Sequence, residues 1–370
     1  MNKKKYFIIM IGVFLYIFIL LDQDRFPIEE LNMITGVGYD IEKKSEGMIE
    51  YILPLSINVY KSDGSTTNIV VEEKGENIGE VVQKRQEKLN KKVVQGEERI
   101  VLISEEYAKY GVKTMIEDRF RNAEINDMAF VVVCKGKPQD YLKQKAKGYN
   151  SSAEYIYGLI ENCYSYSFFS DNYKLIDMYV RIGAEGRNLV LPYIEQTEEG
   201  IELMSLAIFN GDKMIAKMNV ENAKILNLLK ENNVKGLVSL KKSPTEYIDF
   251  YGESGKRKVK CNKQGGKYVF SIDLTLTGTI VNNEMYAEIT KDVGQRTQFE
   301  KDMAKNIEKQ CYAFFKIMQK EYKVDCISLG REGAAKFGRR KENDWNKIVS
   351  DADIKVNIKV KVDTQGRGDY

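Results

Sequence analysis

Histidine is absent from all 370 residues of this chain. Its absence removes the commonest general base, the commonest metal ligand and the usual activator of a serine or cysteine nucleophile. Sites built on Ser-His-Asp, Cys-His or His-based zinc chemistry are therefore excluded. We expect no enzymatic activity, no metal and no cofactor.

Cysteine and proline are also scarce. The five cysteines are widely spaced and form no CxxC pair, which argues against a zinc knuckle and against a disulfide framework. Free structural thiols are expected, and one buried disulfide is the alternative. Five prolines, 43% hydrophobic and 30% charged residues indicate a folded chain of two or three domains. The cysteines are Cys134, Cys163, Cys261, Cys311 and Cys326.

Acidic residues are missing from the first 21 positions, which hold three lysines. The whole chain has a formal charge of +3, so the rest of it is balanced. A balanced body argues against nucleic acid as a partner, because such proteins usually present a net basic face.

The three lysines, Lys3 to Lys5, precede an apolar run from Tyr6 to Leu21. This order is typical of a signal peptide or a signal anchor. No small residue marks a cleavage site, and Asp22 follows the run where a lipoprotein would have a cysteine. We expect residues 1–21 to be a retained transmembrane signal anchor, with the chain from about residue 22 outside the cell membrane. A buried core helix is the alternative.

Three short motifs resemble a nucleotide-binding site or a pair of catalytic carboxylates, but a purely structural role explains each of them better. Gly36-Val37-Gly38 lacks the third glycine of a dinucleotide fingerprint, which would fall at Ile41, and no helical pattern follows it. The acidic pairs Glu105-Glu106 and Glu117-Asp118 lie in helical patterns. Neighbours on a helix point in different directions, so surface charge is expected there and not acid–base catalysis.

Strand-like and helix-like patterns alternate along the chain. A long helix is expected over 295–323 and an amphipathic strand over 353–362, with a hairpin turn at Asn210-Gly211. The predicted fold class is α+β, with mainly antiparallel sheets. The expected units after residue 21 are an N-terminal region at 22–190, a β-rich domain at 191–290 and a helix-plus-strand domain at 291–370.

Four stretches, in order, carry a resemblance to a known family. The first runs from Ile28 to Asp40, the second from Glu106 to Ile125, the third from Ala207 to Ala223, and the fourth begins at Asp325. From about residue 22 to the end, the sequence resembles the Ger(x)C family, the C subunits of nutrient germinant receptors in endospore-forming bacteria. The residues singled out by the resemblance are Thr35, Gly36, Gly38, Asp40, Glu106, Ala108, Lys109, Gly111, Arg119, Gly211, Asp212, Lys213, Asp325, Gly330 and Trp345.

The resemblance implies a three-domain mixed α/β ectodomain in which residues 22–190 are the N-terminal germination-protein region. It implies that this ectodomain is non-enzymatic, lies on the outer face of the spore inner membrane and associates with an A-type and a B-type membrane subunit. It also implies a lipidated cysteine after the leader. Asp22 stands at that position, so a retained helix would replace the lipid. Two other functions stay open: a membrane-anchored protein that binds a small extracellular ligand, and a cell-wall hydrolase that uses two carboxylates without histidine.

Overall fold

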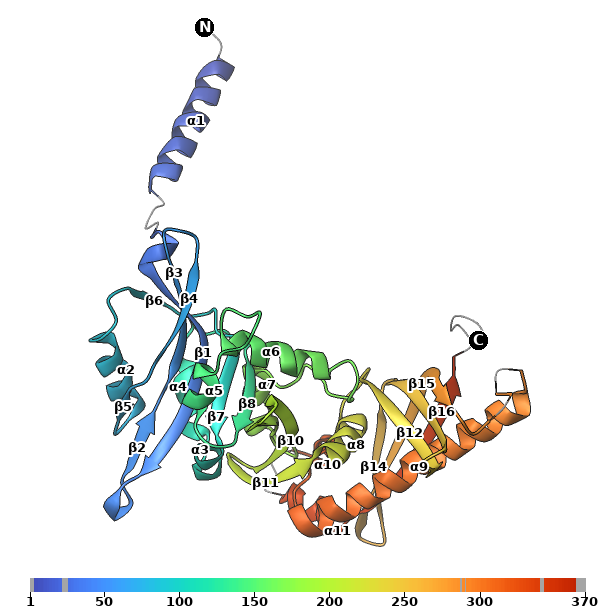
Figure 1. Cartoon of the computed structure of the whole chain (residues 1–370). Helices are drawn as coiled ribbons and strands as arrows, with labels where there is room; N and C mark the ends of the chain where they lie inside the picture. The colour runs from blue at the N-terminus through green and yellow to red at the C-terminus, as the bar shows by residue number, and fades with distance from the viewer. Residues whose placement is uncertain (1–2, 22–25, 287, 290, 340–342, 364–370) are drawn as a thin grey trace.

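A computed structural model describes residues 3–21, 26–286, 288–289, 291–339 and 343–363. Two β-sheets lie side by side with helices around and between them, and α1 (Lys3–Leu21) lies apart from both (Figure 1). Within these ranges, no helix combines the length and apolarity needed to cross a membrane. Asp22 lies outside the described residues.

The first sheet contains eleven strands and mixes both directions of pairing. Its centre, β1-β7-β8-β9, is parallel, whereas β2 and β3 on one side and β10 and β11 on the other pair antiparallel. The strands are β1 (Leu31–Lys43), β2 (Ile49–Ile52), β3 (Leu55–Tyr60), β4 (Thr66–Val71), β5 (Lys74–Gly75), β6 (Lys92–Val94), β7 (Ile100–Ser104), β8 (Phe130–Cys134), β9 (Val190–Thr197), β10 (Gly200–Asn210) and β11 (Lys213–Asn219).

The expectation of mainly antiparallel sheets holds in part: among the described strands nine pairings are antiparallel and five are parallel, so the sheets are mixed. β7 and β8 are buried along their whole length, which is typical of parallel strands covered on both faces. Parallel neighbours need crossover connections, and helices supply them here. The helices of this part are α2 (Ile78–Gln86), α3 (Glu105–Tyr110), α4 (Lys113–Arg121), α5 (Pro138–Lys143), α6 (Ser152–Cys163) and α7 (Leu175–Ile182).

The second sheet contains five strands, and only β15 with β16 pair in parallel. The long helix α9 packs against it through Phe299, Met303 and Ile307, all buried. The strands are β12 (Lys235–Ser243), β13 (Glu246–Ser254), β14 (Lys258–Gln264), β15 (Lys267–Asn283) and β16 (Asp353–Val362). The helices are α9 (Val293–Ile317), a π-helical turn (Met318–Tyr322), α10 (Leu329–Phe337) and α11 (Trp345–Asp351).

Helix α9 also protects the outer edge of β16. The backbone N–H of Ile358 donates to Glu308 Oε1 at 3.1 Å, and that of Val362 donates to Glu300 Oε1 at 2.9 Å. An exposed edge strand is otherwise free to pair with another chain. The two carboxylates therefore accept hydrogen bonds from backbone N–H groups that point away from the sheet at the edge of β16.

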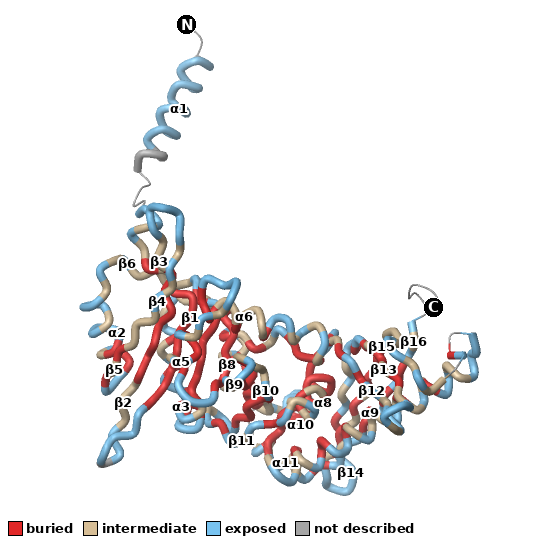
Figure 2. The backbone as a smooth tube through the Cα atoms, in the orientation of Figure 1, coloured by how far each residue is buried: buried red, intermediate tan, exposed pale blue. Residues whose placement is uncertain are grey.

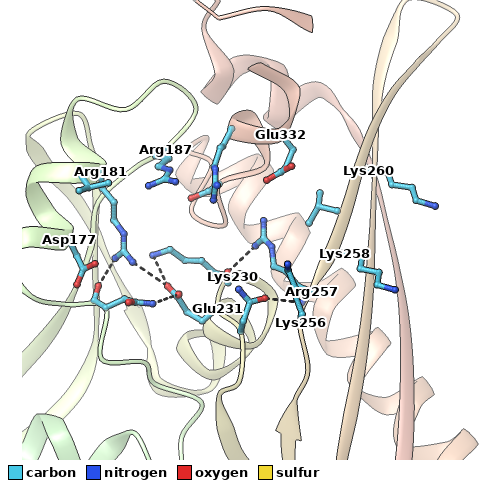
Figure 3. A pocket seen from close by; sticks show the side chains of 16 residues that line it. Asp177, Arg181, Arg187, Lys230, Glu231, Lys256, Arg257, Lys258, Lys260 and Glu332 are labelled. Carbon is cyan, nitrogen blue, oxygen red and sulfur yellow. Dashed lines mark hydrogen bonds and ion pairs between the residues drawn. The ribbon is translucent and has the colours of Figure 1, made fainter. Parts of the chain in front are cut away.

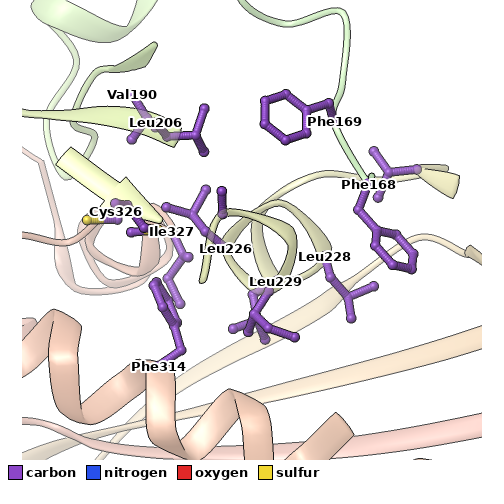
Figure 4. Packing of buried hydrophobic residues seen from close by; sticks show 14 of the residues in the cluster. Phe168, Phe169, Val190, Leu206, Leu226, Leu228, Leu229, Phe314, Cys326 and Ile327 are labelled. Atoms are coloured by element: carbon purple, nitrogen blue, oxygen red, sulfur yellow. The ribbon is translucent and has the colours of Figure 1, made fainter. Parts of the chain in front are cut away.

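Helix α8 (Val220–Lys230) joins the two sheets into one core. Three leucines of α8 lie between side chains beside the first sheet, such as Phe168, and side chains beside the second sheet, such as Phe314 of α9 (Figure 4). They are Leu226, Leu228 and Leu229. Burying each leucine fully stabilises the fold by about 1.5–3 kcal/mol. Buried backbone follows both sheets and continues through α8 (Figure 2).

The strands expected in one unit at 191–290 divide between the sheets. β9, β10 and β11 belong to the first sheet, and β12 to β15 belong to the second. The division into domains at 190 and 290 stays a prediction. All five cysteines are free thiols, and only Cys163 is partly exposed.

Candidate functional site

The first and second sequence motifs meet at a buried ion pair. Arg119 of α4 donates from Nε to the hydroxyl of Tyr39 on β1 at 2.7 Å, and its Nη1 lies 3.6 Å from Glu98 Oε1. The side chains of Arg119 and Glu98 are 6% and 1% exposed. Burial raises the pKa of Tyr39, with Arg119 opposing the rise. This contact fixes α4 against the first sheet.

The glycines of the first motif allow close packing. A Cβ on Gly36 would lie 2.8 Å from Ala153 Cβ, and one on Gly38 would lie 2.5 Å from Pro54 Cγ. Real Cβ atoms do not approach this closely, so both positions require glycine for space. The polar members bond within the first sheet. Thr35 Oγ1 of β1 donates to the Ser56 carbonyl of β3 at 3.3 Å, and the Ile41 N–H donates to the neighbouring Asp40 Oδ1 at 2.9 Å.

The second and third motifs touch through backbone. The N–H of Val112, after α3, donates to the carbonyl of Asp212 at 2.9 Å. Gly111 ends α3 with φ +137°, and a Cβ there would lie 2.7 Å from Asp212 Oδ2. Gly211 has φ +60° in the β10–β11 turn. Of the remaining members, Ala108 is buried, Lys109 pairs with Glu105 at 2.5 Å, and Glu106 and Lys213 are exposed.

Asn346 links the third motif to the fourth. Its Nδ2 donates to Asn210 Oδ1 at 3.1 Å, and its Oδ1 accepts from Asn188 Nδ2 at 2.7 Å and from the Asp325 N–H at 3.1 Å. Asn188 and Asn346 were not predicted, although Asn346 follows Trp345. Asn210 was predicted only as part of the hairpin turn with Gly211. Trp345 itself donates from Nε1 to Glu185 Oε1 at 2.9 Å.

Asp325 holds the turn that leads into α10. Its Oδ2 accepts the N–H of Gly330 at 2.7 Å and its Oδ1 accepts that of Ile327 at 3.2 Å. Burial raises the pKa of Asp325 to about 6, although the backbone hydrogen bonds favour the ionised form. The four motifs thus form a connected series of structural contacts running from the first sheet to the second.

A cleft of about 710 Å³ opens beside the fourth motif (Figure 3). One side of the cleft is formed by α7 and the loop that follows it, beside the first sheet. The other side is formed by the start of β14 and the start of α10, beside the second sheet. Eight basic and three acidic side chains line it. The basic residues are Arg181, Arg187, Lys230, Lys256, Arg257, Lys258, Lys260 and Arg331, and the acidic ones are Asp177, Glu231 and Glu332.

Glu231 lines the cleft and interacts with several neighbouring side chains. Arg181 Nη2 lies 3.5 Å and Lys230 Nζ 3.6 Å from Glu231 Oε1, and Asn172 Nδ2 donates to its Oε2 at 2.7 Å. Burial lowers the pKa of Lys230 to about 8. Burial opposes ionisation of Glu231 as well, but the neighbouring cations lower its pKa overall. This group is an ion-pair network at the wall of the cleft.

Arg257 closes the cleft at its base. Its Nη1 donates to three carbonyls, those of Leu229 at 2.5 Å, Lys230 at 3.2 Å and Ile327 at 2.9 Å. One guanidinium therefore ties the end of α8 to the turn before α10.

In each acidic pair considered for catalysis, one carboxylate is exposed and the other is partly buried in structural contacts. Glu105 accepts a hydrogen bond from Tyr193 and pairs with Lys109, and Asp118 accepts one from Tyr39 at 3.3 Å. Among the described residues, no group of cysteines and carboxylates is placed to hold a metal ion.

Two family models match this chain in sequence. Residues 24–196 match the spore germination protein N-terminal domain, and residues 204–366 match the spore germination B3/GerAC-like C-terminal domain. The chain belongs to the Ger(x)C family of spore germination proteins. The resemblance read from the four stretches is confirmed.

Two relatives in this family match most of this chain. It is 22% identical to spore germination protein GerQC of Bacillus cereus over 351 residues, 92% of this chain and 93% of that one. It is 22% identical to spore germination protein YndF of Bacillus subtilis (strain 168) over 271 residues, 71% of this chain and 66% of that one. The crystal structure of the GerBC protein aligns with a TM-score of 0.53 at 15% identity, covering 88% of this chain and 97% of that one. The mixed α/β fold is therefore shared.

Proposed function

We propose that this chain is the C subunit of a nutrient germinant receptor, a non-enzymatic protein that assembles with an A-type and a B-type membrane subunit. The two family matches, which together extend from residue 24 to 366, carry the proposal. The names of GerQC and YndF support it, since both are called spore germination proteins.

The proposed attachment to the membrane uses α1. The large apolar side chains from Tyr6 to Ile17 are 42–69% exposed. An apolar surface of this extent on a single helix favours an apolar environment over water. Lys4 and Lys5 precede it and would stay at the charged membrane surface. We propose that this segment is retained and holds the ectodomain at the outer face of the membrane.

The mass of the membrane-extracted protein tests this attachment. An intact mass that includes residues 6–21, with no added lipid, supports a retained segment. A chain that begins near residue 22, or one that carries a diacylglyceryl group, contradicts it.

A role in assembly is supported by how the chain uses its motifs. Three contacts between motif residues and their neighbours fix one element of the fold against another. They join Tyr39 to Arg119, Val112 to Asp212, and Asn210 to Asn346. Such contacts build a rigid body whose surface can be presented to partner subunits.

Germination of spores that lack this chain tests the proposed function. The deletion should abolish or slow the response to at least one nutrient, while a trigger that bypasses the nutrient receptors should still work. Re-expression of the full chain should restore the response. Normal germination on every nutrient, in a strain with no other C-type subunit, would refute the proposal.

A further inference from the structure

Two arginines from different parts of the fold are brought together by a backbone contact. A Cβ added to Gly186 would lie 2.2 Å from the carbonyl carbon of Gly330 and 2.4 Å from the nitrogen of Arg331. Arg187 and Arg331 directly follow these glycines, and both line the cleft. The fold therefore brings the backbones of two cationic residues together, and the charge of Arg331 acts unfavourably on that of Arg187.

The repulsion at this point is not offset by acidic partners. Arg187 and Arg331 have no ion pair or side-chain hydrogen bond in the described part of the chain, and the same is true of Lys256, Lys258 and Lys260. Burial, and then the positive charges of Arg331 and Arg181, lower the pKa of Arg187. Of the acidic residues that line the cleft, Glu231 is already shared by Arg181 and Lys230.

A buried ammonium group adds to this excess. The side chain of Lys230 is 5% exposed, and its Nζ makes no hydrogen bond, only the 3.6 Å ion pair with Glu231. Figure 3 shows the Lys230 amine reaching toward Glu231 and Arg181 at the wall of the cleft. A buried N–H donor that makes no hydrogen bond can donate one to an oxygen atom of a bound ligand.

We infer that this cleft binds a small multivalent oxyanion, a compound carrying two or more phosphate or carboxylate groups. Arginine recognises both groups through paired N–H donors, and lysine adds point charge. The volume of about 710 Å³ suits a metabolite-sized ligand. The inference is independent of whether the chain assembles with A-type and B-type subunits.

An anion bound here would bridge the two halves of the chain. Arg181 and Arg187 belong to α7 and the loop after it, beside the first sheet, whereas Lys258, Lys260 and Arg331 belong to β14 and α10, beside the second. Binding would neutralise the repulsion between Arg187 and Arg331. The ligand would therefore raise the melting temperature of the full chain.

Calorimetric titration of the detergent-solubilised full chain tests this inference. The probes are inorganic pyrophosphate, citrate and a short-chain cardiolipin, all of which carry two or more anionic groups, each compared with potassium chloride at equal ionic strength. We expect saturable binding of at least one probe to one site, with a rise in melting temperature that chloride does not produce. Binding of the lipid alone would identify the ligand as a headgroup, whereas binding of free phosphates or citrate would identify a soluble anion.

A pair of matched variants locates the binding. Arg187→Gln with Arg331→Gln should weaken binding about tenfold or more. Lys359→Gln with Lys361→Gln removes the same charge from the exposed face of β16 and should change affinity less than about twofold. If the double arginine variant melts early without ligand, Arg331→Gln alone is the decisive variant, because Arg331 is exposed. No saturable binding of any probe, or an equal loss in the β16 variant, would overturn the inference.

Discussion

Gly186 and Gly330 touch backbone to backbone, and this contact places the loop after α7 against the start of α10. A Cβ on Gly186 would lie 2.2 Å from the Gly330 carbonyl carbon, and one on Gly330 would lie 2.9 Å from Gly186 Cα. Gly186 also has φ +70°, a conformation that costs other residues about 1–2 kcal/mol. Both space and conformation therefore demand glycine at 186.

Gly186→Ala should lower the free energy of unfolding of the full chain by about 2–4 kcal/mol, because strain and overlap add. Gly183→Ala is the matched control, since no atom lies within 4 Å of its added Cβ and its φ is −101°. The control should change stability by less than about 1 kcal/mol. Chemical denaturation followed by circular dichroism measures both, and equal effects would contradict the close contact.

Arg119→Met should destabilise the fold by about 3–5 kcal/mol, because it leaves the buried Glu98 carboxylate without its cation. Adding Glu98→Gln to this variant removes the unpaired charge. The double variant should be more stable than Arg119→Met alone. A double-mutant cycle from denaturation curves measures the coupling, and purely additive effects would contradict a buried ion pair.

Asp325 should make stability depend on pH between about 4 and 6. Its pKa is about 6 in the folded chain and about 4 when unfolded, so the folded state binds the extra proton. The stabilisation is fully present below about pH 4 and is lost as the pH rises through 6. Relative to Asp325→Asn, the wild type should lose about 2–3 kcal/mol from pH 4 to 7. A difference that does not vary with pH would contradict the raised pKa.

Asn346→Ala should cost about 2 kcal/mol or more, because it removes hydrogen-bond partners from Asn188, Asn210 and the Asp325 N–H. Asn357→Ala is the control, since Asn357 is exposed and its side chain, among the described residues, hydrogen-bonds only to Asp273 Oδ1 at 3.0 Å. That variant should stay within about 0.5 kcal/mol of the wild type. Thermal unfolding of the two variants side by side checks the difference.

The local sequence pattern predicted individual helices and strands better than it predicted which strands pair with each other. The apolar period of α9, the alternation of β16 and the Asn210-Gly211 turn were all visible in the sequence, and the structure places a helix, a strand and a hairpin there. The parallel centre was missed, because strand direction depends on which distant strand becomes the neighbour. For the same reason, the sequence did not predict that β9 pairs with β8.

The residues and contacts of the candidate site were harder to predict from the sequence than the helices and strands. The four family stretches were recognised, but the residues that join them, such as Asn188, have no local signature. The cleft needs Arg187 and Arg331 to meet across two parts of the chain, and tertiary contacts such as that between Gly186 and Gly330 bring them together. A balanced net charge over the body concealed this local excess of basic residues.

Affinity purification of the full-length chain from spore membranes tests the central proposal most directly. With a tag at the C-terminus and mild detergent, mass spectrometry should detect one A-type and one B-type receptor subunit in amounts comparable to the tagged chain. A parallel preparation of an untagged strain gives the background. Recovery of the intact chain with neither subunit above that background would contradict its role as a receptor subunit.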